Sequence, residues 1–114
     1  MRYMLLICSE EAGYAKFTEA DMGRLMADYE KLTSDLKTAG ALVCADRLQP
    51  TGTATTVRVR GGKTLTTDGP FAETKEQLGG HYTIEAKDLD EALAWAARVP
   101  TAHYGSVEVR PVWE

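Results

Sequence analysis

The sequence predicts an α+β domain in which two helices cover one face of an antiparallel sheet. Apolar runs of strand length alternate with two stretches of helical periodicity, in the order strand, helix, strand, hairpin, strand, helix, strand. No stretch has the composition of a linker, a low-complexity tract or an internal repeat, so residues 1–114 are expected to form one domain. Right-handed crossovers fold two such βαβ halves into a ferredoxin-like sandwich, with the hairpin inserted between them.

The first half begins with a strand and a capped helix. Residues 2–8 are apolar on both alternating sets, which is typical of a central strand covered on both faces. After a polar loop over residues 9–17, Thr18 caps a helix, with Asp21 reaching back from its third position, and Gly40 ends it. The apolar stripe of this helix consists of Met22, Leu25, Met26, Tyr29, Leu32 and Leu36.

A hairpin separates the two halves. Residues 41–48 form an apolar run of strand length, and Pro50 ends it. Residues 55–60 alternate with period two, and Gly61-Gly62 turns the chain into a returning strand over residues 63–67.

The second half repeats strand, helix, strand. Residues 80–86 alternate between apolar and polar side chains. Asp88 then caps a second helix, with Glu91 three residues further on, and the helix stops before Pro100. Residues 105–113 form the last strand.

The helices are expected to leave the other sheet face open. We expect them to cover Val57, Tyr82, Ile84, Val107 and Val109, which leaves Arg58, Arg60, His81, Thr83, Glu85, Glu108 and Arg110 on the opposite face. Because residues 2–8 are apolar on both sides, a fully wet second face would expose three large side chains at the sheet centre. We therefore predict a homodimer through this face, in which two sheets enclose a partly polar cavity.

The composition argues against two classes of partner. The chain is 44% hydrophobic and 26% charged, as in an ordinary soluble domain. Thirteen Lys and Arg against seventeen Asp and Glu give a formal charge of −4 without runs of like charge, so no nucleic-acid partner is expected. The apolar residues 1–8 are too short to span a bilayer and lack a signal-peptide layout. We therefore expect a cytoplasmic protein with no membrane partner.

Asp68 is the first candidate catalytic residue. In the turn from Thr67 to Phe71, Asp68 can accept backbone N–H groups, Pro70 restricts Gly69, and Phe71 is expected to anchor the loop in the core. Such a turn holds a carboxylate rigidly at a strand end, where it can act as an acid or base. The structural alternative is that Asp68 only closes the turn.

His81 is the second candidate, a general base near Glu85 on the polar face, and its alternative is an ordinary surface histidine. Arg58 is a candidate for holding a carboxylate or phenolate of a small ligand, since its planar fork suits planar anions. Lys75, which follows the Asp68 turn, is a second candidate for substrate binding, although solvated charge is the default for both cations.

The remaining reactive residue types predict no cofactor. Cys8 and Cys44 lie within apolar runs and form no Cys-x-x-Cys motif, so buried free thiols are expected. Two histidines without further ligands at metal spacing predict no metal site. Gly61-Gly62 and Gly79-Gly80 lack the strand-to-helix context of a phosphate loop.

Several of these motifs together resemble the YCII-related family, in its DGPF-domain branch. They are residues 66–76, with Asp68-Gly69-Pro70-Phe71 inside them, then residues 78–80, residues 88–100, and the ending Val107-Glu108-Val109-Arg110-Pro111. The resemblance implies a ferredoxin-like fold that dimerises through its sheets, as dimeric α/β barrels do. It also implies an enzyme with a histidine and an aspartate at a cleft, a few relatives acting on halogenated hydroxyquinols, and genes often placed beside extracytoplasmic-function sigma factors. The family aspartate falls on Asp68 and the family histidine near Tyr29, where this chain has no histidine.

Three functions follow. The first is a cofactor-independent lyase or isomerase that moves a proton on a small anionic or aromatic substrate, with Asp68 assisted by His81 or Tyr29. The second is a non-catalytic ligand-binding or regulatory module that works with a sigma factor. The third is a structural dimer. A carboxylate with a strongly perturbed pKa in a closed cavity favours the first, and a solvated Asp68 favours the others.

Overall fold

A computed structural model describes all 114 residues and confirms the α+β class. Four strands form the main sheet: β1 (Arg2–Ser9), β2 (Leu42–Arg47), β5 (Gln77–Glu85) and β6 (Ser106–Pro111). The main helices are α1 (Glu19–Thr38) and α2 (Leu89–Ala96), and two further strands are β3 (Thr55–Arg60) and β4 (Lys63–Asp68). Three short 3₁₀ helices complete the structure: η1 (Glu11–Lys16), η2 (Thr51–Thr53) and η3 (Pro100–His103).

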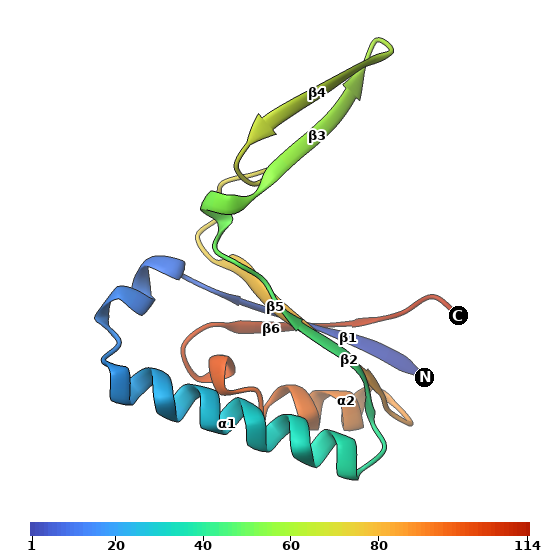
Figure 1. The fold of residues 1–114 in the computed structure, drawn as a ribbon. Coiled ribbons are helices and arrows are strands. Elements are labelled where there is room, and N and C mark those ends of the chain that lie inside the picture. Colours follow the sequence, from blue (N-terminus) through green and yellow to red (C-terminus); the bar gives the residue numbers. More distant parts are fainter.

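The main sheet has the strand order β2-β5-β1-β6, and every neighbouring pair is antiparallel. The two halves of the chain therefore interdigitate, with β1 and β5 at the centre. Both helices lie on the same face of the sheet (Figure 1). This arrangement is consistent with the predicted ferredoxin-like sandwich. No helix is both long and apolar enough to cross a membrane.

The helix boundaries follow the predicted caps. Thr18 Oγ1 accepts a hydrogen bond from the Asp21 N–H at 3.0 Å, and Asp21 Oδ2 accepts one from the Thr18 N–H at 2.9 Å. Gly40, with φ of +69°, ends the helical path of α1. At the second helix, Asp88 Oδ1 accepts from the Glu91 N–H at 2.9 Å. These bonds satisfy N–H groups that a helix start otherwise leaves unpaired.

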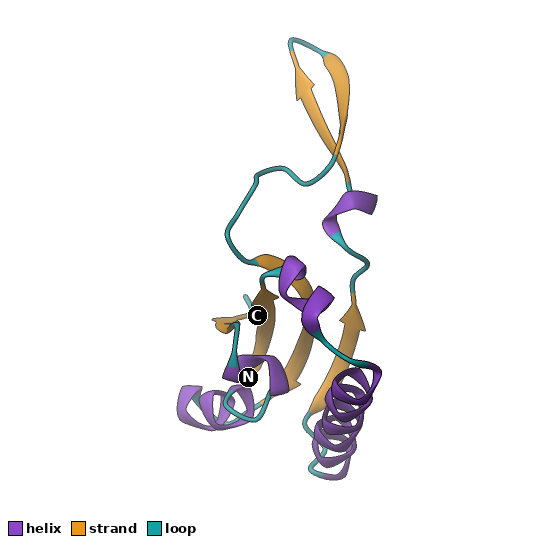
Figure 2. Ribbon diagram, turned by 90° about the vertical axis from the view of Figure 1, so that its left-hand side faces the viewer, coloured by secondary structure: helices purple, strands orange, loops and turns teal.

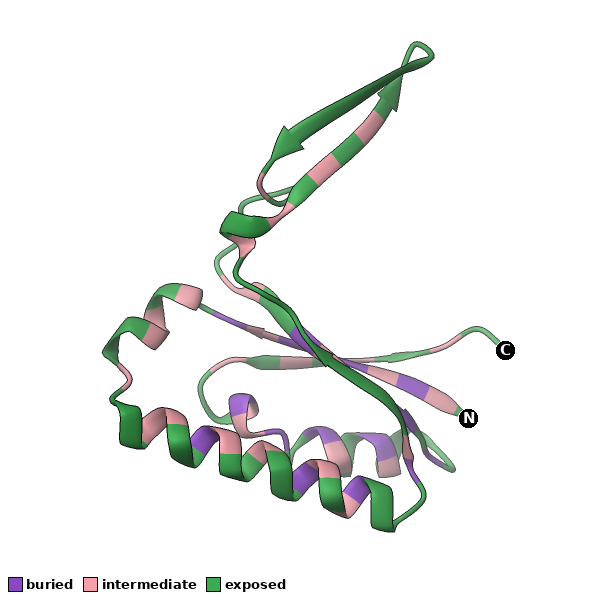
Figure 3. Ribbon diagram, viewed as in Figure 1, coloured by how far each residue is buried: buried purple, intermediate pink, exposed green.

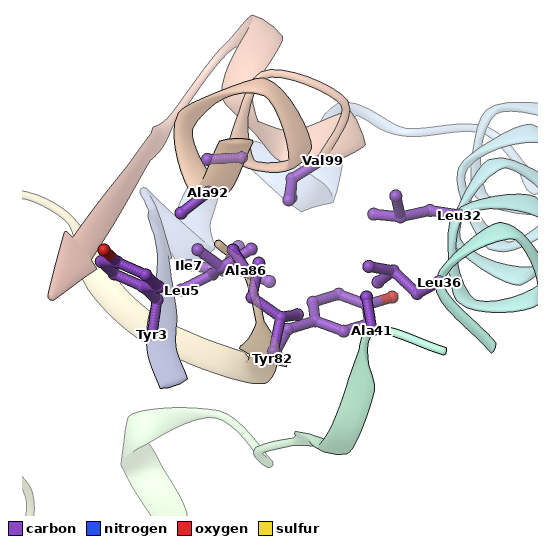
Figure 4. Close-up of a cluster of buried hydrophobic side chains, with 12 residues drawn as sticks. Tyr3, Leu5, Ile7, Leu32, Leu36, Ala41, Tyr82, Ala86, Ala92 and Val99 are labelled. Atoms are coloured by element: carbon purple, nitrogen blue, oxygen red, sulfur yellow. The ribbon is translucent and has the colours of Figure 1, made fainter. Parts of the chain in front are cut away.

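The core lies between the sheet and the helix layer (Figures 3 and 4). Along β1 buried and partly buried residues alternate, so one set of side chains faces the helices. Leu5, Leu36 and Ile84 are fully buried there. The complete cluster is Tyr3, Leu5, Ile7, Leu32, Leu36, Ala41, Tyr82, Ile84, Ala86, Ala92, Ala96 and Val99.

The opposite sheet face carries no second layer, as predicted, and we call it the open face. Its central row of partly buried apolar side chains, Met4, Leu6 and Cys8, comes from β1. Strand register sets Thr83 beside Met4 and His81 beside Leu6, so the predicted polar residues of β5 share this face. Glu108 and Arg110 do so from β6.

The hairpin was placed wrongly by the sequence pattern. Strands β3 and β4 form a separate two-stranded sheet that projects from the body (Figures 1 and 2), so Val57, Arg58 and Arg60 lie on neither face of the main sheet. We call residues 55–68 the arm. The radius of gyration is 16.1 Å, whereas a compact chain of this length has about 13 Å. Pro50, which has no N–H, follows shortly after β2 and helps to turn the chain outward.

Candidate ligand cleft

A cleft of about 470 Å³ lies between α1 and the helix-facing side of the sheet. Helix α1 contributes Met22, Leu25, Met26 and Tyr29, and these residues belong to the apolar stripe whose spacing predicted this face. The sheet contributes residues of β2 and β5, and η1 and η3 close one end. The other lining residues are Ile7, Ser9, Glu11, Tyr14, Ala45, Asp46, Arg47, Leu48, Pro50, Gln77, Gly79, Gly80, His81, Tyr82 and Thr101.

Tyr29 is the predicted site residue that this cleft holds on its helix side. Its ring stacks on that of Tyr82, with ring centroids 6.4 Å apart and planes 10° from parallel. Its hydroxyl is hydrogen bonded to Thr101 Oγ1 at 2.5 Å. The stack holds the ring from the sheet side and the hydrogen bond fixes its polar end, so Tyr29 presents a defined hydroxyl to the cleft.

The Tyr29 hydroxyl is one end of a chain of hydroxyl groups. From Thr101, the chain continues to Tyr104 at 3.4 Å, then to Tyr14 at 3.1 Å, and ends at Ser9 Oγ, a further 3.1 Å away. In each contact either oxygen can be the donor. The five hydroxyl groups come from α1, η1, β1, and η3 with the residue that follows it. All of them except that of Tyr104 line the cleft.

Burial sets the protonation of these phenols. It raises the pKa of Tyr29, an effect that the hydrogen bond between Tyr29 and Thr101 partly offsets. Burial also raises the pKa of Tyr104, to about 12, and the pKa of Tyr82. These phenols therefore stay protonated near neutral pH, and the cleft offers neutral hydroxyls that donate and accept hydrogen bonds.

His81 forms a second feature at the edge of the cleft, where the alternation of β5 directs its side chain to the open face. Its Nε2 lies 3.5 Å from Asp46 Oδ2, and its Nδ1 is buried without a hydrogen-bond partner. Glu85, the carboxylate that the sequence suggested, instead binds the N-terminal amine of Met1 at 3.0 Å. Asp46 was missed because its proximity to His81 depends on the register of β2 against β5.

Asp68 lies neither in the cleft nor beside the His81–Asp46 pair. It is the exposed last residue of β4, opposite Thr55 on the arm. Its turn is held by the backbone of the next residue, since the Gly69 N–H donates to the Ala54 carbonyl at 2.7 Å and the Gly69 carbonyl accepts from Thr56 Oγ1 at 2.8 Å. The expectation that Phe71 anchors this loop in the core is wrong, because its exposed fraction is 77%.

The two candidate cations for substrate binding also lie apart from the cleft. Arg58 is on the arm, where its Nη2 donates to the Phe71 carbonyl at 3.2 Å. Lys75 lines a separate groove with Tyr14, Glu76 and Tyr104, among others. Within one chain, the structure therefore places Tyr29 in the cleft, His81 on the open face, and Asp68 with Arg58 on the arm.

The cysteines fit their prediction only in part. Cys8 is partly buried, and burial together with the carboxylates of Glu76 and Glu108 raises the pKa of its thiol. Cys44 is exposed, which corrects the expectation of a buried thiol. The physical reason is that β2 is an edge strand with no layer over its open-face side. No group of three or more His, Cys, Asp or Glu side chains is arranged to hold a metal ion.

The fold and the cleft define a class: a small α+β domain with a pocket between its first helix and its sheet. The chain belongs to the YCII-related domain family, whose model matches residues 1–114. It is 40% identical over 114 residues to an uncharacterized protein of Rhizobium meliloti (strain 1021), an alignment that covers 98% of this chain and 92% of that relative.

Proposed function

We propose that the protein binds a small amphipathic molecule in the cleft between α1 and the sheet. The observation that carries this proposal is the cleft itself, whose volume of about 470 Å³ falls in the usual range for small-molecule sites. Its lining combines apolar side chains with the ordered hydroxyl chain that ends at Tyr29. An apolar or aromatic body with one polar end matches that combination.

The rim of the cleft suggests the charge of the polar end. Arg47 lines the cleft and forms no salt bridge, and its Nη1 lies 3.9 Å from Met26 Sδ. The lining holds two carboxylates. Glu11 is bonded to Thr51, at 2.8 Å to its N–H and 2.7 Å to its Oγ1, and Asp46 lies 3.5 Å from His81 Nε2. A carboxylate or phenolate near Arg47 would therefore meet an available guanidinium. This supports a small anionic or aromatic ligand.

The protonation of the cleft favours binding over proton abstraction. Burial raises the pKa of Tyr29, so this phenol stays neutral and serves as a hydrogen-bond donor and acceptor, whereas a general base at neutral pH needs a pKa near 7. Met22 and Met26 can adapt their unbranched side chains to different ligand shapes. A sensor or regulatory module, including one linked to a sigma factor, is a function of this kind.

Binding can be tested with 8-anilinonaphthalene-1-sulfonate, an aromatic anion that fluoresces in apolar surroundings. We expect saturable binding to the protein, abolished by Met26→Trp, which fills the cleft. Tyr29→Phe should weaken binding about tenfold through one lost hydrogen bond. Leu93→Trp, an exposed position on α2, is the matched control and should bind normally. Unchanged binding by Met26→Trp, with circular dichroism showing a folded protein, would refute the cleft as the site.

A second candidate function is proton transfer on the open face, and the contact between His81 and Asp46 supports it. His81 Nε2 and the exposed Asp46 carboxylate form the pair that can exchange a proton with a substrate, whereas Nδ1 is buried. This site would need the proposed second copy to enclose it and to bring an acid such as Asp68. In D₂O, small aromatic and anionic carbonyl compounds should then gain deuterium with the wild type but not with His81→Gln. Equal incorporation by the two proteins would rule this function out.

A further inference from the structure

The arm, residues 55–68, forms a separate sheet that has little contact with the rest of the chain. Strands β3 and β4 pack chiefly against each other rather than against the helices or the main sheet. Isolated two-stranded hairpins are at best marginally stable in water. Figure 3 shows that no residue of the arm is buried in the single chain. The arm thus offers two uncovered surfaces without an intramolecular partner.

One surface of the arm is uncharged over its middle. Strand register puts Val57 opposite Thr66 and Val59 opposite Thr64, so these four β-branched side chains share one side. Both valines are 59% exposed. Exposed β-branched side chains arranged on one face of a strand pair are a favourable surface for packing against another apolar surface.

The other surface of the arm is basic. Arg58, Arg60 and Lys63 alternate with the valine side, and Asp68 is the only carboxylate in the segment, so the arm has a formal charge of +2. The whole chain has a formal charge of −4, which leaves −6 on the rest of it. The arm and the body are therefore electrostatically complementary, although within one chain the arm points away from the body (Figure 2).

We propose that the arm of each chain docks on the open face of a second copy of this chain. The valine side would cover the uncovered apolar row of β1, Met4 and Leu6. The cations lie on the outer side of the docked arm, where their positive charge is attracted over a distance to the net negative body of the partner. Asp46 contributes to that negative charge on the open face, because its side chain is 74% exposed beside His81. The inference rests on the second copy at the open face, and it is independent of the ligand in the cleft.

Reciprocal docking would give an interface of sufficient size and would bring Asp68 near His81. A stable interface uses roughly 20 to 30 residues on each side. The arm has two strands of six residues, and the open face adds alternate residues of four strands, which supplies a patch of that order. The same docking brings Asp68, which lies on the valine side of the arm, to the face that holds His81. Asp68 and His81, which are separated within one chain, would thereby meet between two chains.

Sedimentation equilibrium of the full chain tests the proposal. We expect a dimer at micromolar concentration that weakens with added salt, because the positively charged arm is attracted to the negatively charged body of its partner. Val57→Ser together with Val59→Ser should weaken the dimer about 100-fold, roughly tenfold for each valine. Arg60→Glu with Lys63→Glu should also weaken it and reduce its salt dependence. The double variant Leu89→Ser, Leu93→Ser removes comparable exposed leucines from α2 and should dimerise normally.

The outcomes distinguish docking of the arm from dimerisation through the open face alone. A wild-type dimer that is equally tight in the valine variant would overturn the docking of the arm and leave the sheet-to-sheet dimer intact. A monomeric wild type would overturn both and make another protein the occupant of the arm. Neither result changes the fluorescence test of the cleft. Because the substituted residues lie outside the core, circular dichroism should show native secondary structure in every variant.

Discussion

Gly105 offers a sharp test of how the hydroxyl chain is held in place. It joins η3, which carries Thr101, to β6, and its N–H donates to the Thr101 carbonyl at 2.7 Å. A Cβ at this position would lie 2.3 Å from the carbonyl oxygen of Cys8, 2.9 Å from Ser9 Cβ and 3.0 Å from Thr101 Cγ2. Glycine is thus required by the close approach of η3 to β1, which also brings Thr101 and Ser9 to the same end of the cleft.

The cost of Gly105→Ala follows from this contact. The Cβ and the Cys8 oxygen would have to separate from 2.3 Å to at least the 3.4 Å at which ordinary contact begins. The obstructing atom belongs to the backbone of the central strand, so no side-chain rotation relieves it. Overpacking costs about 1 to 3 kcal/mol, and we expect the upper end, about 3 kcal/mol. For 114 residues this lowers Tm by roughly 12 °C.

The assay is thermal and urea unfolding followed by circular dichroism, at one protein concentration because self-association would shift Tm. Gly23→Ala is the matched control. Gly23 lies within α1, and a methyl group added there would have no other atom within 4 Å, so alanine should stabilise the protein by about 0.5 to 1 kcal/mol. If Gly105→Ala unfolds at the wild-type temperature, the close approach of η3 to β1 is refuted.

Three further predictions concern the core, a helix cap and alkaline pH. Leu36→Ala, at a fully buried position, should cost about 2 to 5 kcal/mol in urea unfolding, and a much smaller loss would contradict its place in the core. Asp88→Ala removes the bond to the Glu91 N–H and should cost about 1 kcal/mol by the same measurement, whereas Asp88→Ser should retain most of it. The pKa of Tyr104 is raised to about 12 in the folded protein, so its contribution to stability is present below pH 10 and is lost as the pH rises toward 12. Unfolding at a series of alkaline pH values should therefore show a shallower loss in Tyr104→Phe than in the wild type, and identical slopes would count against this assignment.

Local signals predicted the elements well. Thr18 and Asp88 cap the helices as expected, and the two-sided apolar pattern of residues 2–8 placed β1 at the centre of the sheet. These features depend on neighbours within a few residues, where hydrogen-bond geometry and side-chain periodicity act directly. The alternation of β5 likewise placed Tyr82 on the helix side.

Contacts between residues far apart in the sequence could not be predicted from local patterns. The alternation of residues 55–60 identifies a strand but not the sheet it joins, so Arg58 was assigned to the main sheet although it lies on the arm. Tyr29 was selected as a site residue through a family resemblance, but its partner Thr101 is 72 positions away and carries no motif. Asp46 reaches His81 only through pairing register, which single-strand periodicity does not contain.

The hydrogen bond from the Leu48 N–H to the Gly79 carbonyl, 2.9 Å long, closes the root from which the arm leaves the body. Residues 49–76 form an excursion that leaves the sheet beside this contact and returns to it, since Gln77 and Leu78 already pair with β1. Insertions, deletions or exchanges within it leave the hydrophobic core and the cleft lining on α1 untouched. The architecture is therefore modular in an evolutionary sense: choice of partner and choice of ligand can diverge separately, and a chain with a short turn in place of the excursion is the natural starting point for engineering either one.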